Sequence, residues 1–197
     1  MSQFTDKIIW ITGATSGIGE ALAYALSEKG AKLILSARRV EELERVKSTC
    51  KGEALLLPLD LCRMQEFELL TQKVITHYGR IDYLINNGGI SQRSEAFETP
   101  LELDRKIMEV NYFGNIALTK AVLPQMQKQK SGTIVVISSL SGKFGFFLRS
   151  AYSASKFALV GFYESLRLEE EKNDIKVSIV FPGFIQTAIS ENALSKD

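Results

Sequence analysis

The chain has 197 residues, of which 45% are hydrophobic and 24% are charged. This composition supports a folded domain of ordinary size and excludes an intrinsically disordered chain. The 24 Lys and Arg residues nearly balance the 23 Asp and Glu residues, and a formal net charge of +1 gives no sign of a nucleic-acid groove or a polybasic membrane patch.

Cysteine and histidine are too few for a disulfide framework or a histidine-rich metal centre. Cys50 and Cys62 are too far apart for a C-x-x-C motif, and His77 is the single histidine. We expect reduced cysteines and no metal. No secretory signal opens the sequence, and no apolar run reaches the about 20 residues that span a bilayer. The sequence therefore predicts a cytoplasmic protein without a membrane segment.

Short apolar runs alternate with longer amphipathic ones along the chain. The apolar runs predict strands at 7–11, 32–37, 53–58, 81–86, 132–138 and 176–181. The amphipathic runs predict helices at 17–29, 40–50, 64–78, 101–128 and 152–173. Gly30 follows the first of these helices at the position of a C-cap, and Pro124 predicts a kink in the fourth.

This alternation predicts an α/β fold. Continuous apolar strands belong to a parallel sheet that is covered on both faces, and right-handed crossovers wind such a sheet in two directions. We expect a Rossmann-like, doubly wound sheet in three layers with strand order 3-2-1-4-5-6. No internal repeat or linker divides the chain, so residues 1–197 are expected to form one domain.

The first predicted strand runs directly into a glycine-rich turn, Thr12-Gly-Ala-Thr-Ser-Gly-Ile-Gly19. Glycines there allow a tight turn and a close approach of the backbone to a pyrophosphate, which sits on the N-terminus of the next helix. A strand before the turn and a helix after it are the context that this motif requires. We expect a dinucleotide to contact Gly13, Thr15, Ser16, Gly17, Ile18 and Gly19.

The end of the second predicted strand indicates which dinucleotide binds. An NAD site usually has an acid there for the ribose 2'-hydroxyl, whereas this chain has Arg38 and Arg39. Two guanidinium groups can hold a 2'-phosphate, so NADP(H) is preferred and NAD(H) is the alternative. Solvated arginines that precede a helix are the other interpretation. Asp60 and Leu61 are expected to meet the adenine, and Asn87, Gly88 and Gly89 to approach the cofactor at the end of the fourth strand.

Tyr152 and Lys156 stand four residues apart, so they share one face of a predicted helix. An ammonium beside a phenol favours the phenolate and lowers the tyrosine pKa from its usual value of about 10. A tyrosine with a lowered pKa can exchange a proton with an alcohol or a carbonyl near neutral pH. A solvated helix face is the alternative interpretation of this pair.

Together these features resemble the short-chain dehydrogenase/reductase family over nearly the whole sequence. The matching elements are Thr12–Gly19, Asp60-Leu61, Asn86-Asn-Gly-Gly89, Asn111, Ser139, Tyr152-x-x-x-Lys156 and Pro182-Gly-Phe-Ile-Gln-Thr187. The segments Arg149–Lys156 and Phe181–Phe184 are most similar to the hydroxysteroid-dehydrogenase-like dehydrogenase/reductase branch.

The resemblance implies an NADP(H)-dependent oxidoreductase that interconverts a carbonyl and a secondary alcohol by hydride transfer. Tyr152 would be the general acid and base, and Lys156 would lower its pKa and bind the nicotinamide ribose. Ser139 would hold the substrate oxygen; its neighbour Ser138 points the other way along a strand. Asn111 would position a water for proton relay. A last group would pack on the nicotinamide: Pro182, Gly183, Ile185 and Thr187.

The substrate is less closely defined by the sequence. Ser141, Phe144 and Phe184 could line an apolar pocket for a lipophilic carbonyl or alcohol, or the aromatic rings could pack the loop itself. The alternatives to this activity are a 3-oxoacyl-thioester reductase, a non-catalytic NADP(H) sensor and a non-enzymatic interaction domain. The resemblance also implies a homodimer or homotetramer through the helices predicted at 101–128 and 152–173.

Two departures from the family pattern are visible. Gly88 replaces the usual alanine of the Asn-Asn-Ala-Gly motif, which loosens the loop slightly. The sequence also ends soon after Thr187, so we expect it to be part of a longer chain and to lack the substrate-covering segment, the last helix and the seventh strand of the family.

Overall fold

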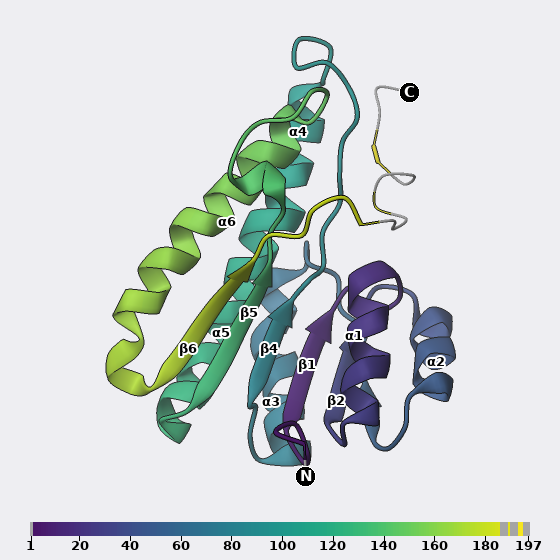
Figure 1. Ribbon diagram of the computed structural model, residues 1–197, viewed down its shortest axis with the longest axis vertical. Helices are drawn as coiled ribbons and strands as arrows, with labels where there is room; N and C mark the ends of the chain where they lie inside the picture. The colour runs from purple at the N-terminus through teal and green to yellow at the C-terminus, as the bar shows by residue number, and fades with distance from the viewer. Residues whose placement is uncertain (1, 186–188, 190–192, 195–197) are drawn as a thin grey trace.

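A parallel sheet forms the centre of the molecule in the computed structural model, which describes residues 2–185, 189, 193 and 194. Within these residues six strands pair in the order β3-β2-β1-β4-β5-β6, all of them parallel (Figure 1). The predicted strand order is confirmed. The strands are β1 (Ile8–Thr12), β2 (Lys32–Ser36), β3 (Ala54–Leu56), β4 (Tyr83–Asn86), β5 (Gly132–Ile137) and β6 (Ile175–Val180).

Helices cover both faces of the sheet, as predicted. Ile9 and Ile11 of β1 pack with residues of α1 (Gly17–Glu28) and α2 (Val40–Thr49). Ile8 and Trp10 point the other way, into a cluster with residues of the helices α3 (Phe67–Tyr78), α5 (Asn115–Gln129) and α6 (Ser150–Glu169). This alternation along one strand lets each face bury its own core.

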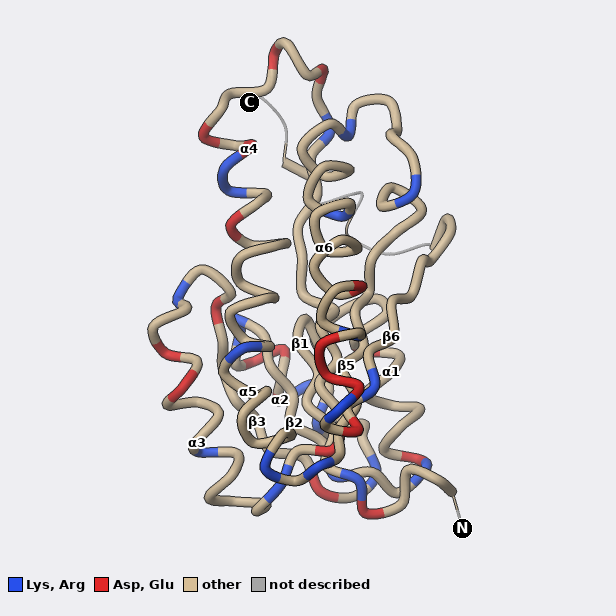
Figure 2. The backbone as a smooth tube through the Cα atoms, turned by 90° about the vertical axis from the view of Figure 1, so that its left-hand side faces the viewer, with Lys and Arg blue, Asp and Glu red and all other residues tan. Residues whose placement is uncertain are grey.

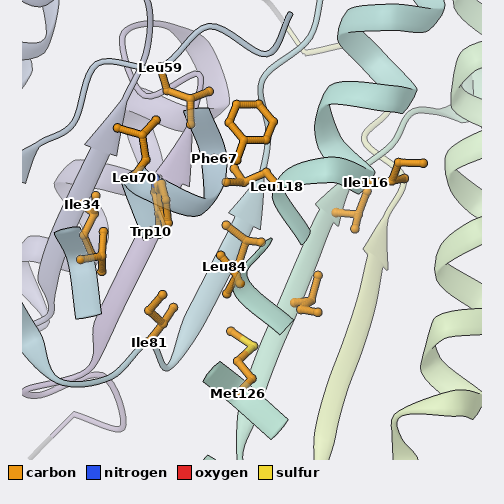
Figure 3. Close-up of a cluster of buried hydrophobic side chains, with 14 of the residues drawn as sticks. Trp10, Ile34, Leu59, Phe67, Leu70, Ile81, Leu84, Ile116, Leu118 and Met126 are labelled. Carbon is orange, nitrogen blue, oxygen red and sulfur yellow. The ribbon is translucent and has the colours of Figure 1, made fainter. Parts of the chain in front are cut away.

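The cluster around Trp10 contains the largest buried side chains (Figure 3). Trp10 is fully buried, and its indole Nε1–H donates to the Ser36 hydroxyl at 2.8 Å. That hydroxyl donates in turn to the carbonyl of Leu57 at 2.7 Å, so the polar atom of a buried tryptophan is satisfied inside the core. Strands β1 and β2 are thereby joined by side chains as well as by their ladder.

Charged residues of both signs are interspersed along the backbone (Figure 2). Lys32 and Glu53, for example, pair at 3.5 Å with both side chains partly exposed, an arrangement that contributes little to stability. No helix among the described residues is both long and apolar enough to cross a membrane.

The helix predicted at 101–128 is interrupted. The structure divides it into α4 (Leu101–Met108), a π-helical segment η2 (Glu109–Gly114) and α5. A π-helical segment has i→i+5 hydrogen bonds in place of i→i+4, and the apolar pattern at 101–128 was interpreted as one continuous α-helix. Pro124 lies inside α5, which continues to Gln129. The C-cap of α1 is Lys29, and Gly30, predicted at that position, follows it with the left-handed φ of +81° that glycine favours just after a helix.

We predict opposite effects for two helical glycines replaced by alanine. A Cβ on Gly114 would lie 2.4 Å from the Leu61 carbonyl oxygen, so Gly114→Ala should lower the free energy of unfolding by about 1–3 kcal/mol. Gly161 in α6 has nothing within 4 Å of its added Cβ, and Gly161→Ala should raise that free energy by about 0.5–1 kcal/mol. Urea denaturation measures both, and a similar change in the two variants would contradict the close approach at Gly114.

Candidate active site

A cavity of about 1090 Å³ opens at the carboxyl ends of the strands, around the point between β1 and β4 where the winding of the sheet reverses. It brings together most of the predicted site residues: Gly13, Thr15, Ser16, Gly17, Ile18, Arg38, Arg39, Asp60, Leu61, Asn87, Gly88, Gly89, Ser139, Ser141, Tyr152, Lys156, Pro182, Gly183, Phe184 and Ile185. Gly19, Asn111 and Phe144 do not line it, and Thr187 lies outside the described residues.

The glycine-rich turn has the backbone geometry that an anion site requires. Gly13 and Gly17 have φ values of +62° and +54°, which side chains disfavour. Ser16, the N-cap of α1, makes no side-chain capping bond, so backbone N–H groups at the start of this helix remain available beside the cavity. Free donors and the positive end of a helix dipole fit a pyrophosphate.

Gly19 packs closely against the glycine-rich turn and the Asn87 side chain. A Cβ there would lie 2.2 Å from the Gly13 carbonyl oxygen and 2.5 Å from Asn87 Nδ2. Only a residue without a side chain lets α1 approach the turn this closely. Gly19 thus lets the turn and α1 pack closely, and its contact with the cofactor stays a prediction.

Thr12 and Asn87 join the ends of β1 and β4 beneath the cavity. The Thr12 hydroxyl accepts hydrogen bonds from the backbone N–H groups of Asn87 (3.1 Å) and Gly88 (3.0 Å). Asn87 returns two bonds from Nδ2, to the carbonyls of Thr12 (3.0 Å) and Gly13 (3.1 Å). This reciprocal set of bonds fixes the glycine-rich turn relative to the Asn87–Gly89 loop.

The two arginines that are predicted to bind a 2'-phosphate line the cavity at the end of β2. Arg38 and Arg39 are exposed, and neither guanidinium makes a hydrogen bond or ion pair within the described part of the chain. A third arginine is engaged differently. Arg45 of α2 donates to Glu20 at 2.7 Å and to the Thr15 carbonyl at 3.0 Å, and so ties α2 to the glycine-rich turn.

Lys156 is buried below the predicted catalytic tyrosine. Its ammonium donates to the carbonyl of Ile137, at the end of β5, at 2.9 Å, and it lies 5.7 Å from the centre of the Tyr152 ring. Burial disfavours the charged form and lowers the pKa of Lys156 to about 8.

The pKa of Tyr152 does not follow the prediction. Burial raises it above the usual value, and this effect exceeds the opposing influence of the Ser139 side chain and of the charge on Arg149. The cation that favours the phenolate is thus Arg149, next to the start of α6, and not Lys156, whose ammonium is turned toward Ile137. The predicted lowering of the Tyr152 pKa by Lys156 is therefore wrong for this structure.

The two neighbouring serines after β5 separate as strand alternation predicts. Ser139 interacts with Tyr152, and its oxygen also accepts from the N–H of Ser141 at 3.1 Å. Ser138 is buried, and its hydroxyl is directed at the Lys156 carbonyl at 3.5 Å. Ser139 is therefore the serine that faces the tyrosine.

Asn111 is fully buried in η2 behind the cavity wall. Its side chain accepts from the N–H of Ile90 at 2.8 Å, and donates to the Ile90 carbonyl at 2.9 Å and to the Ser155 hydroxyl at 3.0 Å. It thus connects three segments: the loop after β4, the π-helical segment and α6. Its backbone partner belongs to that loop and not to its own helix.

The conformation of the aromatic loop 143–148 differs from the prediction for one proposed substrate residue, Phe144. Phe144 lies outside the cavity lining, whereas Phe146 lines it and contacts both Phe144 (ring centres 5.1 Å apart) and Phe184 (6.1 Å). Three residues that were not predicted also line the cavity: Ser91, Arg93 and Arg149. Only Arg149 carried a signal, because it directly precedes the tyrosine motif.

A doubly wound parallel sheet with a glycine-rich turn and a Tyr-x-x-x-Lys helix at its switch point defines a Rossmann-like fold of the dehydrogenase type. The model of the short chain dehydrogenase family matches residues 7–197. The chain therefore belongs to the short-chain dehydrogenase/reductase family, whose members are oxidoreductases that use NAD(H) or NADP(H).

Similar proteins support the same assignment. The chain is 49% identical to a dehydrogenase/reductase SDR family protein 7-like from Anopheles gambiae and 48% identical to the human dehydrogenase/reductase SDR family member 7. Both alignments cover 98% of this chain but only 63% and 59% of the relatives, so the chain spans about three fifths of their length.

Solved structures agree in fold. A short-chain dehydrogenase from Streptomyces avermitilis superposes with a TM-score of 0.89 at 36% identity, covering 96% of this chain and 69% of that protein. Levodione reductase superposes with a TM-score of 0.93 at 31% identity, covering 96% and 76%.

The lowered pKa of Lys156 predicts a specific dependence of stability on pH. The pKa falls from 10.5 to about 8 on folding, so between these values the unfolded chain holds a proton that the folded chain lacks. The contribution of Lys156 to the free energy of unfolding is therefore greatest above pH 10.5, and it falls as the pH drops from 10.5 through 8. The free energy of unfolding of the wild type, relative to Lys156→Met, should rise by about 3 kcal/mol across this window. Denaturant titrations at several pH values measure it, and a difference that stays constant would show that the buried amine does not titrate there.

Proposed function

We propose that the protein is an NADP(H)-dependent oxidoreductase that interconverts a carbonyl and a secondary alcohol on a lipophilic substrate, with Tyr152 as general acid and base. The observation that carries the proposal is one cavity that joins the glycine-rich turn, the free arginines, Ser139 and Tyr152. The bound dinucleotide supplies or accepts the hydride. The chain's own residues supply orientation and the proton.

Each residue near the reacting oxygen has a role that its position supports. The Ser139 hydroxyl holds and polarises the substrate oxygen, and the Tyr152 hydroxyl transfers the proton to or from it. Lys156, which lines the cavity, would hold the nicotinamide ribose of the bound dinucleotide. Asn111 fixes the loop that carries Gly89 through its two hydrogen bonds to the backbone of Ile90. The loop passes close to it, because a Cβ on Gly89 would lie 3.1 Å from Asn111 Oδ1.

An apolar rim supports a lipophilic substrate. Phe146, Phe147 and Phe184 line the cavity beside Tyr152, and Phe147 and Phe184 are 83% and 94% exposed. Covering exposed aromatic rings removes apolar surface from water, which makes the binding free energy of an apolar ligand more favourable. Apolar ketones, reduced in the presence of NADPH, are therefore the substrates for the assays below.

Removing the phenolic hydroxyl should abolish most of the activity. Tyr152→Phe should lower kcat for ketone reduction at least about 100-fold, because a positioned acid contributes about that factor or more, while NADPH binding is kept. Tyr83→Phe is the matched control, since Tyr83 lies on β4 outside the cavity lining. Steady-state kinetics and a fluorescence titration with NADPH measure both. Near-normal turnover by Tyr152→Phe would remove the proposed mechanism.

The preference for NADP(H) rests on the two free guanidinium groups. One hydrogen bond to a charged group is worth about 1.5–3 kcal/mol, or roughly ten- to a hundredfold in affinity. The double variant Arg38→Ala/Arg39→Ala should raise the Kd for NADPH at least about tenfold and change that for NADH by less than about twofold. Arg63→Ala, an arginine outside the cavity lining, is the control. Equal losses for NADPH and NADH would exclude a 2'-phosphate site at these arginines.

A further inference from the structure

Gln92, which follows β4 and the Asn87–Gly89 loop, is fully buried and uses both ends of its side-chain amide. Its Oε1 accepts from the backbone N–H groups of Ala151 (3.1 Å) and Tyr152 (3.4 Å), across 59 and 60 residues of sequence. Its Nε2 donates to the Thr99 hydroxyl (2.9 Å) and lies near further oxygens of Ser94 and Ser150. The orientation of the amide is fixed, because backbone N–H groups only donate and the Ser94 carbonyl only accepts.

These contacts replace a missing helix cap. The first N–H groups of a helix have no partner within the helix, and a Ser, Thr, Asp or Asn at the N-cap usually accepts from them. Here the N-cap of α6 is Arg149, which makes no side-chain capping bond and has no acceptor to offer. Gln92 therefore does from a distant loop what a capping residue does locally.

The residue before the helix, Arg149, contacts the same loop. The Arg149 guanidinium donates to the Gln92 carbonyl at 2.6 Å and to the Ser91 hydroxyl. The loop after β4 thus accepts from the N-cap residue and, through the Gln92 side chain, from the next turn of the helix. Tyr152 is the third residue of α6, so the backbone that carries its phenol belongs to the turn that this connection holds.

We propose that Gln92 is a positioning residue for Tyr152: its amide oxygen caps α6 and sets where the phenolic hydroxyl stands relative to Ser139. The catalytic part of this proposal rests on the function proposed above. The first turn of a helix frays when its N–H groups lose their acceptor. A displacement of about 1 Å at a catalytic group can lower a rate about 100-fold.

The test compares two substitutions on opposite sides of the same amide. Gln92→Met keeps the approximate volume and removes the acceptor for Ala151 and Tyr152. Thr99→Val removes a partner of Nε2 and leaves the acceptor in place. Both disturb one buried polar cluster, so a purely structural role predicts losses of activity that follow the loss of stability in the two variants.

If Gln92 positions Tyr152, the two variants should differ in activity. In Gln92→Met, kcat for ketone reduction should fall about 10- to 100-fold, while the substrate KM and the NADPH Kd change by less than about twofold. Amide hydrogen exchange at Ala151 and Tyr152 should become at least about tenfold faster, with the rest of α6 unchanged. Thr99→Val should keep kcat within about twofold of the wild type and should keep both amides protected.

Gln92→Glu keeps an acceptor oxygen toward α6, so the amides of Ala151 and Tyr152 should stay protected from exchange in this variant. This variant tests the proposal if Gln92→Met does not fold. Equal losses of kcat in Gln92→Met and Thr99→Val at equal stability, or fast exchange at both amides in Gln92→Glu, would overturn the proposal. A wild type that reduces no ketone would refute the proposed function, whereas the exchange rates would still report whether Gln92 holds the backbone of Tyr152.

Discussion

The site depends on the reciprocal hydrogen bonds between Thr12 and Asn87. They join two strands that are neighbours in the sheet but are followed by connections that leave in opposite directions, and this divergence is what opens the cavity. The threonine hydroxyl satisfies two backbone donors of the β4 loop, and the asparagine amide satisfies two carbonyls of the glycine-rich turn. Because these polar groups satisfy one another, the backbone at the switch point stays ordered although it leaves the ladder.

Burial is the main influence on the pKa values of the proposed catalytic pair, Tyr152 and Lys156. It raises the pKa of Tyr152 and lowers that of Lys156, so both groups are moved toward their uncharged forms. A tyrosine that keeps its proton is in the form that donates to a substrate oxygen during reduction. Arg149 opposes this effect from the start of α6, and its own pKa is lowered by burial and by the nearby charge of Arg93. The charge balance of the site thus depends on residues beyond the Tyr-x-x-x-Lys motif.

The strand order and most of the cavity lining could be predicted because they follow from local patterns. Apolar runs, glycines with positive φ and a helical i, i+4 pair all leave a signal within a few residues. The features that were missed depend on distant contacts. The π-helical segment lies within one long apolar pattern, the direction of the Lys156 ammonium is set by a carbonyl on β5, and Gln92 meets α6 only after the chain has folded. The sequence placed Phe144 in the pocket because aromatic residues fill the whole loop 143–148, and only the loop conformation distinguishes it from Phe146.

Arg45 has a consequence for engineering cofactor preference. The loop that carries Arg38 and Arg39 leads into α2, and α2 is fastened through Arg45 to Glu20 and to the Thr15 carbonyl in the glycine-rich turn. Arg45 therefore connects the two ends of the proposed dinucleotide site. A loop grafted from an NAD-dependent relative should therefore preserve Arg45 and Glu20, so that the contact between α2 and the glycine-rich turn is kept.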